Sequence, residues 1–327
     1  MIRVPRRAFI ASIIKVSGNV NADMGVGTRI PLKKIYTWNQ EVRVFVSARC
    51  IRRCIRERLY EKGFQIDPLQ LVGPRGAQQL GDVGNPVEYI DDDLFGYLLP
   101  VREGASLKRK SPITISHLIS LRHTEVKPEF AARFPRDFLP VFKEEYPVPF
   151  EVEVAEWLGR LDVIVTERVG CFEKGELGEE LKEKHKDKLQ MRGSKHCLND
   201  DERRGRLRAF LEVLLWEGWQ FPRAAQSPST PEFYYSVIAL TERFVPIFGY
   251  VDIDDEGRLS QAELENLRNL YAPSIDKLFV IDYRTAKYQK YEKTGDKTLE
   301  RKEEERLNAE SIESIIKEVC GYIIPGQ

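Results

Sequence analysis

The segment VRVFVSARCIRRCIRERL, Val42 to Leu59, concentrates positive charge on what its pattern predicts to be a strand running into a helix. From Ser47 onward, apolar residues recur at three- and four-residue spacing, which is typical of the buried stripe of an amphipathic helix. These apolar residues are Ile51, Cys54, Ile55 and Leu59. Ser47 stands at the expected N-cap position. The arginines fall off the stripe, so we expect them at the edges and outer face of the helix, where guanidinium groups can bind phosphates. They are Arg49, Arg52, Arg53 and Arg56.

The positive charge of the chain is local. Residues 1 to 60 contain thirteen Lys or Arg and three Asp or Glu, a surplus of ten, whereas the whole chain has 51 of each and no formal net charge. Its 327 residues, 42% of them apolar, suffice for one large domain or two ordinary ones. The five cysteines are scattered, and no signal peptide or long apolar run is recognisable. We therefore expect a cytoplasmic protein without a membrane partner.

Residues 8 to 20 are rich in β-branched and apolar residues, which predicts a buried strand. In the loop that follows, Asn19, Asn21 and several glycines allow the backbone to approach a ligand closely, and Arg29 lies at the exit of the loop. The sequence GVGTR is neither a dinucleotide fingerprint nor a P-loop, because the later glycine and the Gly-Lys-Ser ending are missing.

The middle of the chain contains a predicted insertion and several strands. Residues 63 to 112 have many glycines and prolines, an acidic run EYIDDDLFGY and the basic residues Lys108 to Lys110. The polar residues 173 to 202 are expected to form a mobile surface segment. Strands are expected near residues 113 to 121, 150 to 154, 161 to 165, 233 to 240 and 244 to 253, with a turn near Gly159 and Arg160 joining the second and third.

A second amphipathic helix is expected from Leu207 to Leu214, ending at Gly218. The chain closes with a charge run at residues 287 to 305 and a short helix from Ile312 to Val319. Without the insertions, the elements follow in the order strand, helix, strands, helix, strand. This order predicts an α+β fold with a ferredoxin-like βαββαβ core, the arrangement that RNA-recognition domains also use.

Four sequence blocks, taken in order, resemble a known family. They are SGNVNADMGVGTRIPLKKI with the basic helix behind it, YIDDDLFGY, KRKSPITISHLISL, and LRAFLEVLLWEGWQFPRAAQSPSTP. Together they resemble the backbone subunit of type I CRISPR surveillance complexes (Cascade), the seventh Cas protein family, in its DevR-type branch found with type I-B systems. The blocks are spread over most of residues 8 to 240.

The resemblance implies a non-catalytic protein, shaped like a right hand, that polymerises along CRISPR RNA (crRNA) and supports pairing of the guide with target DNA. Its implied partners are crRNA, the target strand, further copies of itself, and the Cascade subunits of the fifth and eighth Cas protein families and the small subunit. No cofactor is implied. The expected parts are an RNA-recognition-like palm at 1 to 62 and 113 to 286, an inserted finger domain at 63 to 112, a thumb loop near 173 to 202 or 219 to 231, and a C-terminal segment at 287 to 327.

The residue types fit this role. A filament that accepts any guide must hold the sugar-phosphate backbone and leave base edges free, which calls for Arg, Lys, Asn and Ser side chains. The N-terminus of a helix at Ser47 would also favour anions. The expected RNA-binding residues are Asn19, Asn21, Arg29, Ser47, Arg49, Arg52, Arg53, Lys108, Arg109, Lys110, Arg122 and Arg223.

Other interpretations start from acidic residues and histidines. A ferredoxin-like endoribonuclease that processes CRISPR transcripts would use His123 or His117 as acid or base. Asp91 to Asp93 with Glu88 would be a magnesium site in a nuclease, but no Lys or His follows at a recognisable spacing. The more natural place for these acids is a turn and surface of the finger domain.

Asp252 to Glu263 matches the calcium-loop template at four positions. A calcium loop needs a helix before it, whereas the preceding residues predict a strand, and Ser260 with Glu263 equally forms a capping box for the next helix. The sequence leaves calcium binding open. Packing is expected for the cysteines, because Cys171, His196 and Cys197 lie too far from Cys50 and Cys54 in sequence to predict a zinc site.

Overall fold

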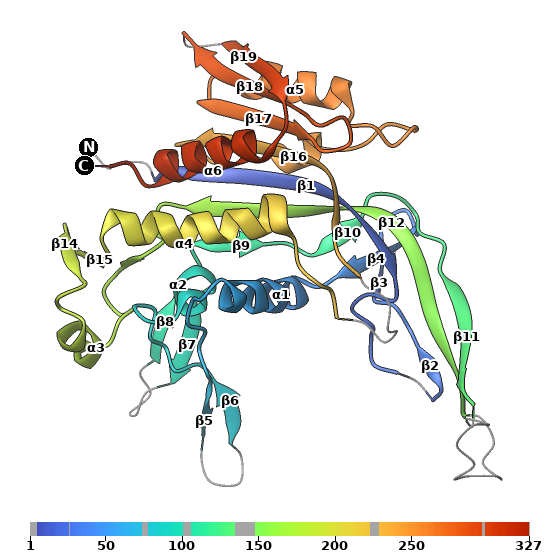
Figure 1. The fold of residues 1–327 in the computed structure, drawn as a ribbon, viewed down its shortest axis with the longest axis horizontal. Helices are drawn as coiled ribbons and strands as arrows, with labels where there is room; N and C mark the ends of the chain where they lie inside the picture. The colour runs from blue at the N-terminus through green and yellow to red at the C-terminus, as the bar shows by residue number, and fades with distance from the viewer. Residues whose placement is uncertain are drawn as a thin grey trace.

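The computed structural model describes residues 5–25, 27–73, 78–100, 106–134, 148–222, 229–295 and 298–326. These residues form a mixed α/β fold in which one large, mostly antiparallel sheet is covered by helices on both faces (Figure 1). None of the helices in this part of the chain is long and apolar enough to cross a membrane.

The main sheet is built around β1 (Arg7–Gly18), which pairs antiparallel with β12 (Val148–Thr166) and β16 (Glu232–Thr241). The strand order is β19-β18-β17-β16-β1-β12-β10-β4-β3, and β9, β11 and β2 also pair with β12. The other strands are β2 (Arg29–Ile30), β3 (Lys34–Tyr36), β4 (Val42–Val46), β9 (Ile113–Ile115), β10 (Leu118–Ser120), β11 (Lys127–Arg133), β17 (Lys277–Asp282), β18 (Lys287–Thr294) and β19 (Thr298–Arg306).

Both faces of β1 are buried, which explains its nearly unbroken apolar sequence. Ile10 and Ile14 pack in one core with α1 (Ala48–Glu61), α4 (Asp200–Glu212) and α6 (Ala309–Ile323). Phe9, Ala11 and Ile13 belong to a second core on the other face, which also contains residues of η3 (Ile247–Tyr250) and α5 (Gln261–Tyr271).

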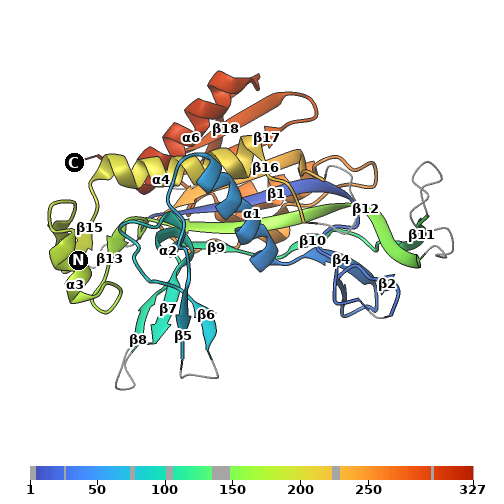
Figure 2. The same cartoon turned by 60° about the horizontal axis from the view of Figure 1, so that its bottom comes forward.

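Two sets of hairpins project on the side of the molecule where α1 lies (Figures 1 and 2). One set follows α1 in the chain, in the region where the sequence predicts an insertion. Its elements are β5 (Gln70–Val72), β6 (Gln79–Gly81), α2 (Ile90–Phe95), β7 (Tyr97–Pro100) and β8 (Ser106–Arg109). The other set is an arm formed by β11 and the first half of β12, which β2 joins as a parallel strand. In both views α1 lies between the two sets.

The predicted turn at Gly159 and Arg160 is wrong, because both residues lie inside the continuous strand β12. There they pair with Ile14 and Ile13 of β1. The glycine serves close packing, since a Cβ at residue 159 would lie 2.3 Å from the Trp157 ring and 2.9 Å from the carbonyl oxygen of Ile119.

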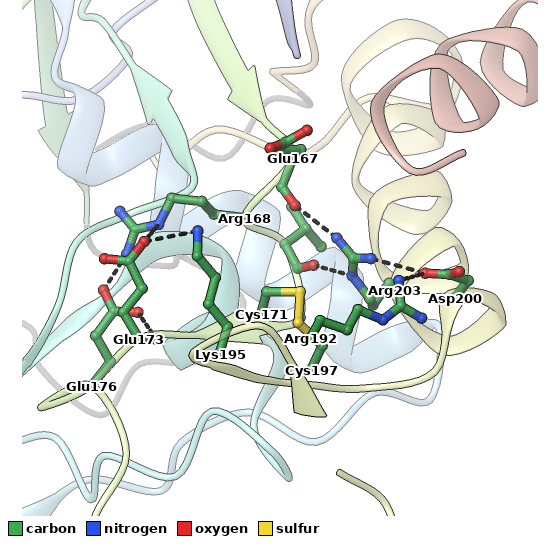
Figure 3. Close-up of a disulfide and its surroundings, with 12 residues drawn as sticks. Glu167, Arg168, Cys171, Glu173, Glu176, Arg192, Lys195, Cys197, Asp200 and Arg203 are labelled. Atoms are coloured by element: carbon green, nitrogen blue, oxygen red, sulfur yellow. Dashed lines mark hydrogen bonds and ion pairs between the residues drawn. A yellow bond between two sulfur atoms is a disulfide. The ribbon is translucent and has the colours of Figure 1, made fainter. Parts of the chain in front are cut away.

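The expected mobile segment at 173 to 202 is a small folded unit instead. It contains α3 (Glu179–Lys184), β14 (Gln190–Arg192) and β15 (Lys195–Cys197), β15 pairs with β13 (Cys171–Phe172) just before the segment, and α4 begins within it. Phe172, Leu177 and Leu198 form its core. A disulfide joins Cys171 to Cys197, so packing alone was the wrong expectation for this pair (Figure 3). Cys50 and Cys54 are free and buried, as expected.

Two expectations near the C-terminus also need correction. The charge run forms β18 and β19, which extend the main sheet by antiparallel backbone pairing, with cross-strand ion pairs such as Lys290 with Glu303. The strand expected at 244 to 253 is a 3-10 helix, η3, which begins after Pro246. The second amphipathic helix and the C-terminal helix were predicted correctly: α6 covers the expected residues, and α4 continues as a π-helix, η2 (Val213–Glu217), that ends at Gly218 with φ +71°. The short helices α2 and α3 were not expected.

Candidate nucleic-acid interface

Three segments meet at the start of α1. The Ser47 side chain caps the helix by accepting from the backbone N–H of Cys50 at 3.3 Å. The N–H of Ser47 donates to Oδ1 of Asn21 at 2.8 Å, and the N–H of Ala48 donates to Nδ1 of His117 at 2.8 Å. Asn21 has φ +53°. The loop after β1 is thereby fixed to the helix N-terminus, and the arginines that follow have a rigid base.

The arginines of α1 differ in whether they have acidic partners. Arg49 is exposed, and among the described residues neither it nor Arg52 has an ion-pair partner. Nε of Arg52 is buried without a hydrogen-bond partner. Burial, together with the positive charges of Arg56 and Arg49, lowers the pKa of Arg52. An anion bound here would relieve both the repulsion and the missing hydrogen bond.

The remaining arginines of this helix are already paired. Arg53 contacts Glu57 at 3.0 Å and Arg56 contacts the buried Asp91 at 2.7 Å. Arg58 pairs with Glu61 and Glu217. The arginines available to bind phosphates are therefore Arg49 and Arg52.

Three other predicted residues have protein partners of their own, and a fourth cannot be placed. Asn19 is buried and donates to the carbonyl oxygen of Glu153 at 2.7 Å, so its role is to hold the loop after β1. Arg29 pairs with the same glutamate at 2.7 Å, although its side chain is half exposed. Arg122 donates to Asp252 at 2.9 Å and to the carbonyl oxygen of Ile253 at 2.7 Å. Arg223 lies outside the described residues.

Lys108 and Lys110 are exposed near the end of β8, whereas Arg109 between them points inward. Arg109 was the wrong choice for RNA binding, because its side chain is completely buried and pairs with Asp93 and Glu176. It also lies over the ring of Phe172, 4.6 Å from the centroid. Its role is to join the inserted hairpins to the unit that contains the disulfide.

Lys33 was missed by the sequence analysis. It lies near Cys50 in the first turn of α1. A hydrogen bond with Cys54 lowers the pKa of the Cys50 thiol, and the positive charges of Lys33 and Arg53 lower it further, whereas burial raises it. Among the described residues Lys33 has no ion-pair partner. The signal was the lysine pair at the start of β3, of which Lys34 pairs with Glu153 and Lys33 adds positive charge beside the helix.

The acidic run does not bring Glu88 and Asp91 to Asp93 together as a metal site. Asp91 pairs with Arg56, and Asp93 pairs with Arg109 and Arg206. Asp92 instead lies with Asp67 and Asp82, with carboxylate oxygens all within 4.8 Å of one another. Asp67 accepts from the backbone N–H of Leu69 at 2.6 Å and of Val83 at 2.7 Å, so this cluster shapes the base of the β5–β6 hairpin.

Asp92 should make stability depend on pH. Burial, followed by the charges of Asp67 and Asp91, raises the pKa of Asp92 to about 8. Between about pH 4 and pH 8 the Asp92 carboxyl is therefore protonated in the folded protein and ionised in the unfolded chain. The free energy of unfolding should then fall as the pH rises through this range, by roughly 1 kcal/mol per pH unit. Denaturant unfolding at several pH values measures this slope. Asp92→Asn should flatten it, and equal slopes in both proteins would contradict this assignment.

The calcium-loop match is not supported by its surroundings. The element before it is the four-residue η3, not an α-helix. Asp252 is bonded to Arg122, and Asp254 accepts from the backbone N–H and the side chain of Arg258. Ser260 caps α5 by accepting from the N–H of Glu263 at 3.4 Å, which is one half of the predicted capping box; the N–H of Ser260 donates to the carbonyl oxygen of Asp252 at 2.9 Å instead.

The fold and the site define a protein with a large antiparallel sheet, a basic helix and projecting hairpins on either side of it. A solved chain described as "CRISPR RNA-guided surveillance complex, pre-nicking" has this fold, with a TM-score of 0.55 and 12% identity over 97% of this chain and 100% of that chain. A chain described as "CRISPR RNA-guided surveillance complex" has a TM-score of 0.44 and 13% identity, over 81% of this chain and 82% of that chain, which is too distant to support an argument.

The chain belongs to the family "CRISPR-associated negative auto-regulator DevR/Csa2", whose sequence model matches residues 83–256. The match includes the acidic run, β12, the disulfide unit and α4. It confirms the resemblance found in the sequence. No curated protein matches the chain.

Proposed function

We propose that this protein is a non-catalytic crRNA-binding subunit that polymerises along the guide RNA as the backbone of a type I, I-B-like, CRISPR surveillance complex. In this role it supports pairing of the guide with target DNA in the cytoplasm. It contacts other copies of itself, subunits of the fifth and eighth Cas protein families and the small subunit. The observation that supports this most is the pair of arginines, Arg49 and Arg52, which lie on a rigid helix and have no acidic partner in the part of the chain that the structure describes.

The palm of the proposed hand is the part of the sheet that contains β16, β1, β12 and β10. Their antiparallel order, with α1 and α4 packed in one core on the same face, supports a ferredoxin-like arrangement. The finger is the hairpin set between α1 and β9. The β11–β12 arm, which projects on the other side of α1 (Figure 1), is a third candidate for the thumb. Of the two expected from the sequence, residues 173 to 202 fold compactly against the finger, and much of 219 to 231 lies outside the described residues.

The chemistry of the helix suits a guide of any sequence. Guanidinium groups bind phosphate oxygens in bidentate geometry and read no bases, so binding would depend on charge and RNA length and not on sequence. Lys33 beside the first turn of α1 adds a point charge to this surface, and the exposed Lys108 and Lys110 would add charge on the finger. Base edges would remain free for pairing with target DNA.

Incubation with a labelled repeat RNA in the presence of EDTA tests the proposal against the endoribonuclease alternative. Because Nδ1 of His117 and of His123 each accepts a backbone N–H, we expect these histidines to have a structural role and the RNA to stay intact. Protection from added nuclease should increase with RNA length. Specific cleavage that His117→Ala or His123→Ala abolishes would instead establish the nuclease.

A further inference from the structure

We propose that the tip of the β3–β4 hairpin is a stacking platform for single-stranded nucleobases, formed by Trp38 and Tyr36. This inference rests on the proposed RNA-binding function and adds a contact to bases that does not read their sequence. Aromatic side chains stack on any base because every base has a π-face.

The first observation is exposure. The side chain of Trp38 is 94% exposed and that of Tyr36 is 72% exposed. By contrast, Trp157 and Trp219 are 8% and 3% exposed and pack in the core. An indole held in water forgoes the stability that its burial would provide, so its position at the tip calls for a ligand with a flat apolar face.

The second observation is that the tip is rigid. The N–H of Thr37 donates to the carbonyl oxygen of Glu41 at 3.0 Å. The N–H of Gln40 donates to the carbonyl oxygen of Thr37, also at 3.0 Å. The Asn39 side chain donates to Glu41 at 3.2 Å, and Arg43 joins Glu41 to the carbonyl oxygen of Ser120 at 2.9 Å. These bonds fix the backbone of the tip, so a base that stacks on Trp38 needs to order only the side-chain torsions of the indole.

The third observation is position and charge. β4 runs from this hairpin into Ser47, so Val42, which pairs with Tyr36, lies about 17 Å from the start of α1 at roughly 3.3 Å per residue of strand, and the turn with Trp38 lies just beyond that pair. From residue 27 to residue 46 the chain has four Lys or Arg and one Glu. Lys33 has no acidic partner among the described residues. A basic surround favours a polyanion, so an RNA strand whose phosphates lie on Arg49 and Arg52 is a better occupant than an apolar protein surface.

The test compares wild-type protein with Trp38→Ala, Trp38→Phe and the control Trp216→Phe, which removes the other substantially exposed tryptophan. Each is titrated with a uridine-rich RNA and with an abasic RNA of the same length, while tryptophan fluorescence and the salt slope of binding are recorded. We expect the RNA with bases to quench wild-type and Trp216→Phe fluorescence more than the abasic strand does, and this difference to vanish in Trp38→Phe.

Trp38→Ala should weaken binding of the base-containing RNA by about five- to a hundredfold, with the salt slope unchanged because no phosphate contact is lost.

Equal affinity of Trp38→Ala and wild type for this RNA would overturn the platform, as would fluorescence quenching that does not depend on bases. In both cases, binding of the abasic strand with a normal salt slope would leave the proposed function standing. Failure of wild type to bind either strand would overturn both. If Trp38→Ala changed only self-association without RNA, the hairpin would be a protein contact and the inference wrong.

Discussion

Replacing Arg49 and Arg52 together with alanine is expected to weaken RNA binding by at least about tenfold at low salt, whatever the RNA sequence. The salt slope should fall by about 1 to 2 units, because each lost phosphate contact removes roughly 0.7 from the slope for a single strand. Both side chains lie off the buried stripe of α1, so the free energy of unfolding should change by no more than about 0.5 kcal/mol. Binding titrations at four or five salt concentrations measure the slope.

The matched control is Arg53→Ala with Arg58→Ala. It removes the same charge from the same helix, but these arginines already pair with Glu57 and with Glu61 and Glu217. We expect a much smaller change in slope. If the two double variants reduced the slope equally, general charge and not the unpaired arginines would explain binding, and if neither did, the interface would lie elsewhere.

The second large effect is expected for stability. Asp93→Asn should lower the free energy of unfolding by about 3 to 5 kcal/mol, because breaking a buried ion pair leaves uncompensated charge. Both carboxylate oxygens of Asp93 are used: they pair with the buried Arg109 and Arg206 and accept from the N–H of Gly170 at 3.0 Å. Loss of this residue would loosen the finger base from α4 and from the disulfide unit. Denaturant unfolding monitored by circular dichroism measures the change.

Asp201→Asn is the control for Asp93→Asn. Asp201 lies in the first turn of α4 and pairs with Arg204, but its side chain is 94% exposed. Its substitution should change stability by less than about 1 kcal/mol. An equally small effect of Asp93→Asn would show that the buried network contributes little to stability.

The basic helix could be predicted because its signals are local. The stripe at Ile51, Cys54, Ile55 and Leu59 is buried in the structure, and Ser47 is the N-cap. The buried strand β1 and the helix ending at Gly218 follow from the same kind of signal. Apolar spacing and caps depend on neighbours within one or two turns, so a single sequence is enough to locate them.

Elements that depend on distant partners could not be predicted in this way. Gly159 has the composition of a turn, but pairing with β1 and the Trp157 ring keep it in a strand. Residues 173 to 202 have few apolar groups, and their order comes from a disulfide across 26 residues and from ion pairs such as Arg109 with Glu176. Composition alone does not reveal such contacts.

The residues of the candidate site also divide into those that neighbouring sequence predicts and those that depend on distant partners. Arg49 and Arg52 were recognised because only one acid lies near them in sequence, and the structure leaves them unpaired among the described residues. The burial of Arg109 could not be predicted from its neighbours Lys108 and Lys110, because the acids that pair with it lie 16 and 67 residues away in the sequence. A run of basic residues therefore predicts an exposed basic surface only when the acidic residues that pair with it in the fold are known.

Sedimentation velocity of the protein with RNAs of increasing length tests the central claim most directly. If the chain is the backbone of a crRNA filament, the number of bound copies should rise in steps with RNA length, and longer RNAs should load cooperatively because each copy also contacts its neighbour. A constant ratio of one protein per RNA at every length, or cleavage of the RNA into defined fragments, would contradict the account.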